Sequence, residues 1–161
     1  MVVVRAATIE EWRVLRDIRL DALQDAPDAF LSTYAEQAAS AESDWRRRIS
    51  RGCTFFAYIP EVNGSEPVGL VGGFLGESAI VELVSLWVRP LARGLGVGET
   101  LVDAVIRWAR ARNAASVHLW LMEANEHARN LYLRCGFSAT RERQRLPSNP
   151  DLMEVGMMLQ L

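Results

Sequence analysis

The sequence predicts a single α+β domain with a mixed β-sheet of about seven strands. The chain has 161 residues, half of them apolar, which is enough to bury one hydrophobic core. Runs of β-branched residues alternate with stretches of helical periodicity, and neither a repeat nor a linker interrupts them. Two strands near the middle are separated by a helix and are expected to be parallel, whereas pairs joined by turns or loops are expected to be antiparallel. We therefore expect residues 1–161 to form one domain.

The N-terminal part is expected to hold one strand and two helices. In chain order these lie at residues 2–6, 8–23 and 42–51, with a loop or short helix at 25–37. Thr8 and Glu11 have the spacing of a capping box, which predicts that a helix begins there. Pro27 is expected to end that helix, and Gly52 is expected to stand at the C′ position of the second one.

All eighteen basic residues of the chain are arginine. The lack of lysine excludes Schiff-base chemistry and lysine self-acetylation. Four arginines gather near the end of the second predicted helix, namely Arg46, Arg47, Arg48 and Arg51. Glu42 stands one helical turn before Arg46 and is able to pair with it. We interpret the cluster as a solvated face rather than an anion site.

The middle of the chain is predicted to form a hairpin and then a central strand. Residues 54–59 and 68–75 are expected to pair antiparallel through a turn at Asn63-Gly64. The second strand contains Gly69, Gly72 and Gly73, which indicates either a bulge or room for a ligand close to the backbone. Residues 80–88 are mostly apolar, which is typical of a central strand buried on both faces.

The C-terminal part is predicted to alternate between helices and strands. In order, a helix, a strand, a helix and two paired strands are expected at 101–109, 116–122, 125–135, 137–146 and 153–161. Asn125 is expected to cap the second of these helices and Gly136 to end it. Pro147 and Pro150 place a loop between the last two strands.

A glycine-rich loop, Arg93-Gly94-Leu95-Gly96-Val97-Gly98, joins the central strand to the following helix. Glycine allows the backbone to approach a ligand closely and to adopt a positive φ. The first amides of a helix have no partner within the helix, and with the helix dipole they favour an anion such as phosphate. Arg93 adds a permanent positive charge beside the loop. The loop is therefore a candidate phosphate site.

Four interpretations of this loop differ in the residues that they require. A Walker loop needs lysine and is excluded. A dinucleotide loop needs a third glycine where Glu99 stands, although Glu123 lies about where an acidic ribose partner is expected. The pattern R/Q-x-x-G-x-G/A is met in full by Arg93, Gly96 and Gly98. The simplest interpretation is a glycine-rich turn that only packs a helix against a strand.

A second motif lies further along the chain, from Asn125 to Phe137. It fits the pattern N-x-x-A-x-x-L-Y-x-x-x-G-F at every fixed position. Together with the glycine loop, and at the spacing that the family shows, it resembles the GNAT family of acetyl-CoA-dependent N-acyltransferases. The two motifs and the preceding strand cover 56 residues, Glu82 to Phe137. The resemblance implies a sheet whose central strands splay around acyl-CoA, about four flanking helices, and transfer of an acetyl group to an amine.

The resemblance also assigns residues to acetyl-CoA, the co-substrate. Pantetheine would pair with the backbone of Leu86, Trp87 and Val88. The pyrophosphate would bind the loop amides of Arg93, Gly94, Leu95, Gly96, Val97 and Gly98. Asn125 would bind the coenzyme or tie two strands together. No metal is expected, because His118 and His127 are not accompanied by a cysteine pair.

Direct attack of an amine on the thioester in a ternary complex needs a base and a donor to the leaving thiolate. The family tyrosine falls on Tyr132, which becomes the donor candidate, although helical spacing alone would make it a core residue. Glu82 is the base candidate, because it is an acidic residue in an apolar strand just before the pantetheine segment. Glu123 and His118 are weaker candidates.

Composition limits the remaining function classes. A net charge of −2 and a pI near 5.7 lack the electrostatic signature of a nucleic-acid binder. No apolar stretch approaches the roughly 18 residues that span a membrane, and no signal peptide is recognisable, so a cytoplasmic protein is expected. Cys53 and Cys135 are expected to be small buried residues.

Two questions stay open at the level of sequence. A non-catalytic acyl-CoA-binding sensor or scaffold would keep the same loop and strand as an enzyme. The acceptor could be a free amino acid or its analogue, a polyamine, an amino-sugar antibiotic or a protein N-terminus. Homodimers are common in the family, but no residue of this chain establishes one.

Overall fold

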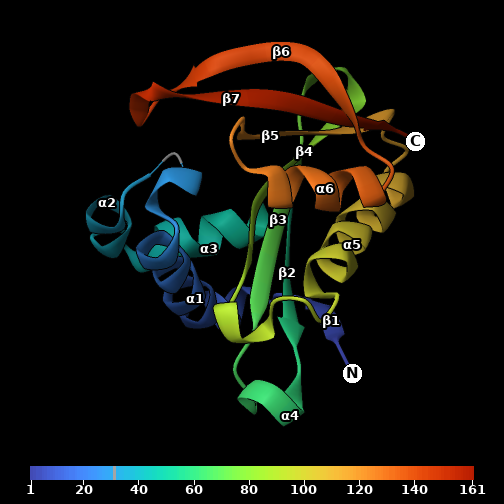
Figure 1. The fold of residues 1–161 in the computed structure, drawn as a ribbon. Coiled ribbons are helices and arrows are strands. Elements are labelled where there is room, and N and C mark those ends of the chain that lie inside the picture. Colours follow the sequence, from blue (N-terminus) through green and yellow to red (C-terminus); the bar gives the residue numbers. More distant parts are fainter. Residues whose placement is uncertain (31) are drawn as a thin grey trace.

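The computed structural model describes residues 1–30 and 32–161, and a seven-stranded mixed sheet forms its centre (Figure 1). Residue 31, within the loop or short helix predicted at 25–37, lies outside the described residues. The sheet order is β1-β2-β3-β4-β5-β7-β6, and β4 and β5 are its parallel pair. The strands are β1 (Val3–Ala6), β2 (Cys53–Tyr58), β3 (Gly69–Leu75), β4 (Ile80–Val88), β5 (Ser116–Met122), β6 (Ser138–Leu146) and β7 (Asn149–Gln160).

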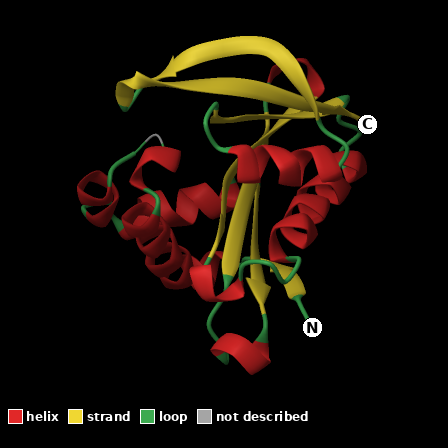
Figure 2. Cartoon of the chain, in the orientation of Figure 1, coloured by secondary structure: helices red, strands yellow, loops and turns green. Residues whose placement is uncertain are grey.

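Helices cover both faces of the sheet (Figure 2). They are α1 (Trp12–Asp25), α2 (Tyr34–Ala38), α3 (Glu42–Ser50), α4 (Pro60–Asn63), α5 (Val97–Ala111) and α6 (Glu126–Arg134). The four helices that the sequence predicts correspond to α1, α3, α5 and α6. The short helix α2 overlaps the segment 25–37, where a loop or short helix is predicted, and α4 is additional. None of the described helices combines the length and the apolar character that crossing a membrane requires.

Two hydrophobic cores lie on opposite faces of the sheet. One joins α5 and α6 to the sheet, with Val105 of α5 and Val117 of β5 at its centre. The other joins α1 and α3 to the sheet, with Trp45 of α3 and Phe56 of β2 fully buried. At the start of α1, the capping box of Thr8 and Glu11 is confirmed, and its first turn is a 3₁₀ turn.

A β-bulge interrupts β4 and changes which face its side chains cover. Opposite the single residue Val71 of β3, the bulged strand places both Ser85 and Leu86. Ser85 has a φ of 62°, in the left-handed region that non-glycine residues seldom adopt. Before the bulge Leu83 packs toward α5, and after it Trp87 packs toward α1.

The prediction that β4 is buried on both faces is wrong. The side chain of Val84, beside the bulge, is 38% exposed, and Ser85 is only half-buried. The sequence pattern does not predict this exposure, because the pattern of apolar residues is the same whether a side chain lies beside an open cavity or in a core.

Two predicted turns differ from the structure. Residues Pro60–Asn63 form α4, so the connection between β2 and β3 is longer than a two-residue hairpin turn. Gly64, at the end of α4, has a positive φ. Proline at the start of the segment favours a helical turn because its φ is fixed. Pro150 lies inside β7, because Leu146 already pairs with Asn149 across a turn at Pro147.

The parallel strands β4 and β5 pair over only three residues. Ile80, Val81 and Glu82 pair with Ser116, Val117 and His118, and no further pair forms beyond them in the described chain. The strands therefore separate toward the end of β4, and the predicted splay is confirmed. Because both strands continue past the last pair, the separation leaves unpaired backbone beside the glycine loop.

Candidate active site

A cavity of about 800 Å³ lies where β4 and β5 separate. Four segments form its walls: the end of α1 with the turn that follows it, the end of β4, the glycine loop with the start of α5, and α6. The predicted coenzyme residues that line it are Leu86, Trp87, Val88, Arg93, Gly94, Gly96, Val97, Gly98 and Asn125. Leu95 does not line it, and its side chain is 51% exposed. The structure thus brings together nearly every residue that the sequence assigns to the coenzyme.

The glycine loop presents a row of free amides to this cavity. Gly94 and Gly96 have φ values of 80° and 81°, which glycine adopts without strain. Gly96 stands at the N-cap of α5, and in the described part of the chain the amides of 94–98 donate to no protein acceptor. These amides and the α5 dipole favour an anion.

Gly98 has a different role from the two glycines before it. A Cβ atom on Gly98 would lie 2.5 Å from Leu131 Cδ1 on α6. Gly98 therefore allows α5 and α6 to pack closely beside the cavity.

Arg93 is held by protein groups rather than being free at the cavity mouth. Its Nη2 lies 2.6 Å from Asp25 Oδ2, and its Nε donates to the Val88 carbonyl at 3.0 Å. Asp25 also accepts from Trp87 Nε1 at 2.9 Å. The Trp87 hydrogen bond and then Arg93 lower the pKa of Asp25. Asp25 ties α1 to the coenzyme segment, and no sequence motif pointed to it.

A second ion pair crosses the cavity wall between α5 and α6. Arg134 Nη2 lies 2.6 Å from Glu99 Oε1, and both residues line the cavity. The hydrogen bond from Arg134 lowers the pKa of Glu99, despite partial desolvation. The pair neutralises a carboxylate that would otherwise repel an anion at the start of α5.

Asn125 caps α6, as predicted. Its Oδ1 accepts a hydrogen bond from the Ala128 amide at 3.0 Å, and its side chain lines the cavity. Its side-chain hydrogen bond is therefore to α6 rather than between two strands.

Tyr132 lies in the core and is only 6% exposed. Its ring centroid is 5.7 Å from that of Phe137. Burial, and to a lesser extent Cys135, raise the pKa of Tyr132, so the phenol stays protonated. Within the described residues its hydroxyl has no hydrogen-bond partner, and Tyr132 is not among the residues that line the cavity, although its neighbour Leu131 is.

Glu82 and His118, predicted as alternative bases, are bonded to each other. His118 Nδ1 lies 2.9 Å from Glu82 Oε2, and its Nε2 lies 2.8 Å from Glu142 Oε1 on β6. Burial lowers the pKa of His118, but the hydrogen bonds and charges of the two carboxylates outweigh it, so the pKa is raised. Glu142 was missed because only tertiary folding brings β6 to this point. Glu123, the other weak candidate, is held in an exposed ion pair with Arg143.

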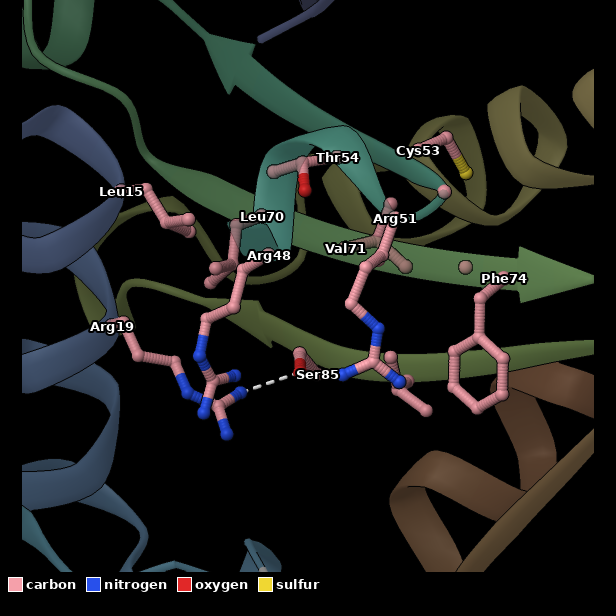
Figure 3. Close-up of a pocket in the computed structure, with 14 residues that line it drawn as sticks. Leu15, Arg19, Arg48, Arg51, Cys53, Thr54, Leu70, Val71, Phe74 and Ser85 are labelled. Carbon is pink, nitrogen blue, oxygen red and sulfur yellow. Dashed lines mark hydrogen bonds between the residues drawn. The ribbon is translucent and has the colours of Figure 1, made fainter. Parts of the chain in front are cut away.

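A smaller cavity of about 150 Å³ lies on the other side of the β4 bulge (Figure 3). Arg19, Arg48 and Arg51 line it together with Val84 and Ser85. Arg48 and Arg51 line this cavity while remaining exposed, so the interpretation of the arginine cluster as a solvated face still holds for them.

Comparison with known proteins places these features in a family. The model described as "Acetyltransferase (GNAT) family" matches residues 12–137. The chain belongs to this family, and the resemblance drawn from the two motifs is confirmed. An acetyltransferase of the GNAT family from Streptococcus pneumoniae has the same fold, with a TM-score of 0.76 at 19% identity over 100% of this chain and 99% of that one.

Two curated relatives are similar over part of their length. Mycothiol acetyltransferase from Stackebrandtia nassauensis is 31% identical over 137 residues, which are 80% of this chain and 41% of the relative. Streptothricin acetyltransferase from Escherichia coli is 29% identical over 93 residues, which are 50% of this chain and 53% of the relative. The chain thus spans about half of these relatives or less.

Proposed function

We propose that residues 1–161 form one N-acetyltransferase domain that transfers the acetyl group of acetyl-CoA to a primary amine in a ternary complex. The observation that carries the proposal is the cavity between the separated strands, which ends at the free amides of the glycine loop. A pyrophosphate bound to those amides would leave the pantetheine arm to follow the unpaired end of β4. The names of both curated relatives include acetyltransferase, which supports the same reaction class.

The residues proposed to bind acetyl-CoA form groups, and each group would bind a different part of the coenzyme. Amides from Arg93 to Gly98 would bind the pyrophosphate. The backbone of Leu86 to Val88 would pair with pantetheine, as a strand pairs with its neighbour. Because the Val88 carbonyl already accepts from Arg93, and Trp87 pairs with Leu70 of β3, the backbone of Leu86 would carry most of that pairing. Asn125 would contact the coenzyme from the start of α6.

Proton removal from the acceptor is the first chemical requirement. An alkyl amine with a pKa of about 10 is protonated near neutral pH and must lose a proton before it attacks. Glu82 would take that proton directly or through water. Its carboxylate is 2.9 Å from His118 Nδ1, which fixes its orientation and connects it to Glu142. The base is then a carboxylate supported by a buried histidine rather than an isolated glutamate.

The leaving thiolate is the second requirement. Once the amine nitrogen bonds to the thioester carbonyl carbon, the C–S bond breaks and the sulfur leaves as a thiolate. Tyr132 would donate a hydrogen bond to that sulfur, because its raised pKa keeps the phenolic proton in place. A thiol pKa of about 8.5 lies below that of a phenol, so hydrogen bonding is favoured over full proton transfer.

A non-catalytic acyl-CoA-binding module is the second candidate function. The burial of Tyr132 away from the cavity lining favours it, because a donor must reach the sulfur. The hydrogen-bonded Glu82 and His118 favour the enzyme, since a binding module needs no base.

Release of free thiol from acetyl-CoA distinguishes the two functions. We expect steady, amine-dependent thiol release across a panel of primary amines, with a mass increase of one acetyl group on the acceptor. Tight binding of acetyl-CoA with no turnover on any amine would instead identify a binding module. Binding of NAD but not coenzyme A would contradict both.

A further inference from the structure

The cavity beside the β4 bulge contains a buried guanidinium that lacks a counter-ion. Arg19 of α1 is 6% exposed. Its Nε donates to Gln37 Oε1 at 2.9 Å, its Nη1 donates to Ser85 Oγ, and its guanidinium carbon lies 4.6 Å from the centre of the Phe30 ring. All three partners are neutral, and no carboxylate of the described chain pairs with it. Buried arginines are seldom left without an opposite charge, so this position favours a negatively charged ligand.

Two further arginines, Arg48 of α3 and Arg51 just after it, lie around the same cavity (Figure 3). Desolvation, followed by the charge of Arg48, lowers the pKa of Arg19 to about 9. Arg51 in turn lowers the pKa of Arg48, after desolvation of that residue. The three positive charges therefore repel one another across the cavity. An anion between them would relieve this repulsion.

The neighbouring arginines of the same helix are paired with carboxylates, unlike the arginines that line the cavity. Arg46 pairs with Glu42 at 3.4 Å and Arg47 pairs with Asp44 at 3.3 Å, both near the surface. Asp44 is the carboxylate that acts on Arg48, but it is already bound to Arg47. Arg48 and Arg51 have no such partner among the described residues.

Hydrogen-bond donors also outnumber acceptors in the helices that cover this face. Gln37 uses its oxygen to hold Arg19, and its buried Nε2 has no acceptor. The indole Nε1 of Trp45 is likewise buried without an acceptor, and Arg48 stacks over that ring at 5.5 Å. Neither the Gln37 nor the Trp45 side chain lines the cavity, so the preference for an anion there comes from the three arginines.

The position of the cavity ties it to the reaction. Ser85 lines the arginine cavity, and the next residue, Leu86, lines the coenzyme cavity, so adjacent residues of the bulge line the two cavities. Glu82 lies on the same face of β4 as Val84, which also lines the arginine cavity. A molecule bound by the arginines would thus lie between the proposed base and the proposed acetyl donor.

We propose that the acceptor amine carries a carboxylate, which Arg19, Arg48 and Arg51 bind while the amine faces Glu82. This inference rests on the proposed acetyl transfer and names the substrate class of that same site. Guanidinium groups bind carboxylates through paired hydrogen bonds. A volume of about 150 Å³ is enough for the carboxylate end of a small amino acid. The acceptor class is then a free amino acid or a close analogue.

Acetyl transfer is to be measured with three matched acceptor sets: α-amino acids, their carboxamides, and amines that carry a phosphate. We expect kcat/KM for the best amino acid to exceed that for its carboxamide by about 10-fold or more, because charged hydrogen bonds are lost in the amide. Equal use of the carboxylate and the amide would overturn the proposal. So would a preference for the phosphate-bearing amines.

Variants at the cavity mouth test the arginines without disturbing the core. Arg48→Gln and Arg51→Gln are expected to raise the KM for the amino acid about 10- to 100-fold, with the KM for its carboxamide and for acetyl-CoA unchanged. Arg46→Gln and Arg47→Gln are matched controls on the same helix and are expected to leave all three values unchanged. Equal effects of all four variants would show a role in folding or net charge and would overturn the assignment.

Direct binding separates this inference from the proposed reaction. The protein is saturated with coenzyme A, and amino acids are then titrated into it in a calorimeter. This measurement detects binding without any turnover. Binding that is lost in Arg48→Gln would support the anion pocket even if no amine were acetylated, in which case only the proposed reaction fails. Turnover of amines without any carboxylate preference would leave the reaction standing and remove the pocket.

Discussion

Among single residues, Tyr132 has the environment that is hardest to reconcile with a catalytic role. Its phenol is buried and has no hydrogen-bond partner in the described chain. We expect Tyr132→Phe to lower kcat by about 10²-fold, because the leaving thiolate loses its donor, and to leave the affinity for acetyl-CoA nearly intact. Steady-state kinetics and calorimetric titration measure the two effects. The control is Tyr34→Phe on α2, an exposed site. An unchanged kcat would make Tyr132 a core residue only.

The pH dependence of a Glu82 variant distinguishes two roles for this residue, a catalytic base and a structural carboxylate. We expect Glu82→Gln to lower kcat/KM by about 10²-fold near pH 7, because the amine must then lose its proton to water. The deficit is expected to shrink as pH rises toward about 10, where the free amine predominates. Glu123→Gln, which changes the exposed partner of Arg143, is the control. A deficit that stays constant with pH would mean that Glu82 only positions other groups.

His118 links pH to stability rather than to rate. Its folded-state pKa is raised by two carboxylates, so the folded protein binds the proton more tightly than the unfolded chain does. Its contribution to the free energy of unfolding is therefore complete below about pH 6.5, the ordinary histidine value, and is lost as pH rises through the raised pKa. Denaturant unfolding across this range should show the decline. In His118→Gln the decline over this window should disappear, and its persistence would assign it to other groups.

At the scale of elements, the junction between α3 and β2 depends on a glycine for space. Gly52 follows α3, as predicted, but its φ is not in the left-handed region. A Cβ atom there would lie 2.0 Å from the Gly73 carbonyl oxygen of β3, which a backbone shift alone could relieve. The glycine is thus required by strand packing rather than by the helix cap.

We therefore expect Gly52→Ala to reduce the free energy of unfolding by roughly 1–3 kcal/mol. For a chain of this size, each kcal/mol corresponds to about 2–4 °C in Tm. Gly76→Ala is the control, because its nearest atom would be 3.4 Å away. Thermal and denaturant unfolding of both variants measure the difference. Equal stability of the two would show that β3 moves away without penalty.

On the scale of the whole molecule, the sheet is nearly divided between β4 and β5. Only three residue pairs join these strands, whereas β5 and β7 pair along the whole of β5. Bound acetyl-CoA would fill the gap and connect the two halves. We expect coenzyme A to slow amide hydrogen exchange at residues 83–88 and 94–99, with little change in β6.

Hydrogen exchange followed by mass spectrometry measures this effect peptide by peptide. At a coenzyme concentration of about 100 times Kd, the free energy of unfolding should also rise by about 2.7 kcal/mol. Stabilisation without slower exchange in those two segments would place the coenzyme elsewhere on the molecule.

Much of the fold could be predicted because its signals are local. The capping box at Thr8, the cap at Asn125 and the glycine loop each act within a few residues of chain, so their spacing in the sequence is enough. The turn at Asn63 was mispredicted, because Pro60 starts a helical turn just before it. The coenzyme half of the site followed from two such local motifs.

The acceptor half could not be predicted in this way, because its residues come from distant parts of the chain. Arg19 meets Ser85 across 66 positions, and His118 meets Glu142 on a strand whose path the pattern did not reveal. Arg48 stands next to Arg47 in the sequence, yet Arg48 lines a cavity and Arg47 pairs with Asp44 at the surface. Which face of a helix meets a cavity is decided by packing.

The sequence by itself determined most of the strand and helix order, the glycine loop before α5 and the family, because backbone conformation and capping depend on residues close together in the chain. Only the tertiary structure decided that Ser85 forms a bulge, that Glu82 and His118 act as one unit, and that a buried arginine lacks a counter-ion. The physical reason is that desolvation and pairing of charges depend on every group within a few ångströms, and those groups become neighbours only when the chain folds.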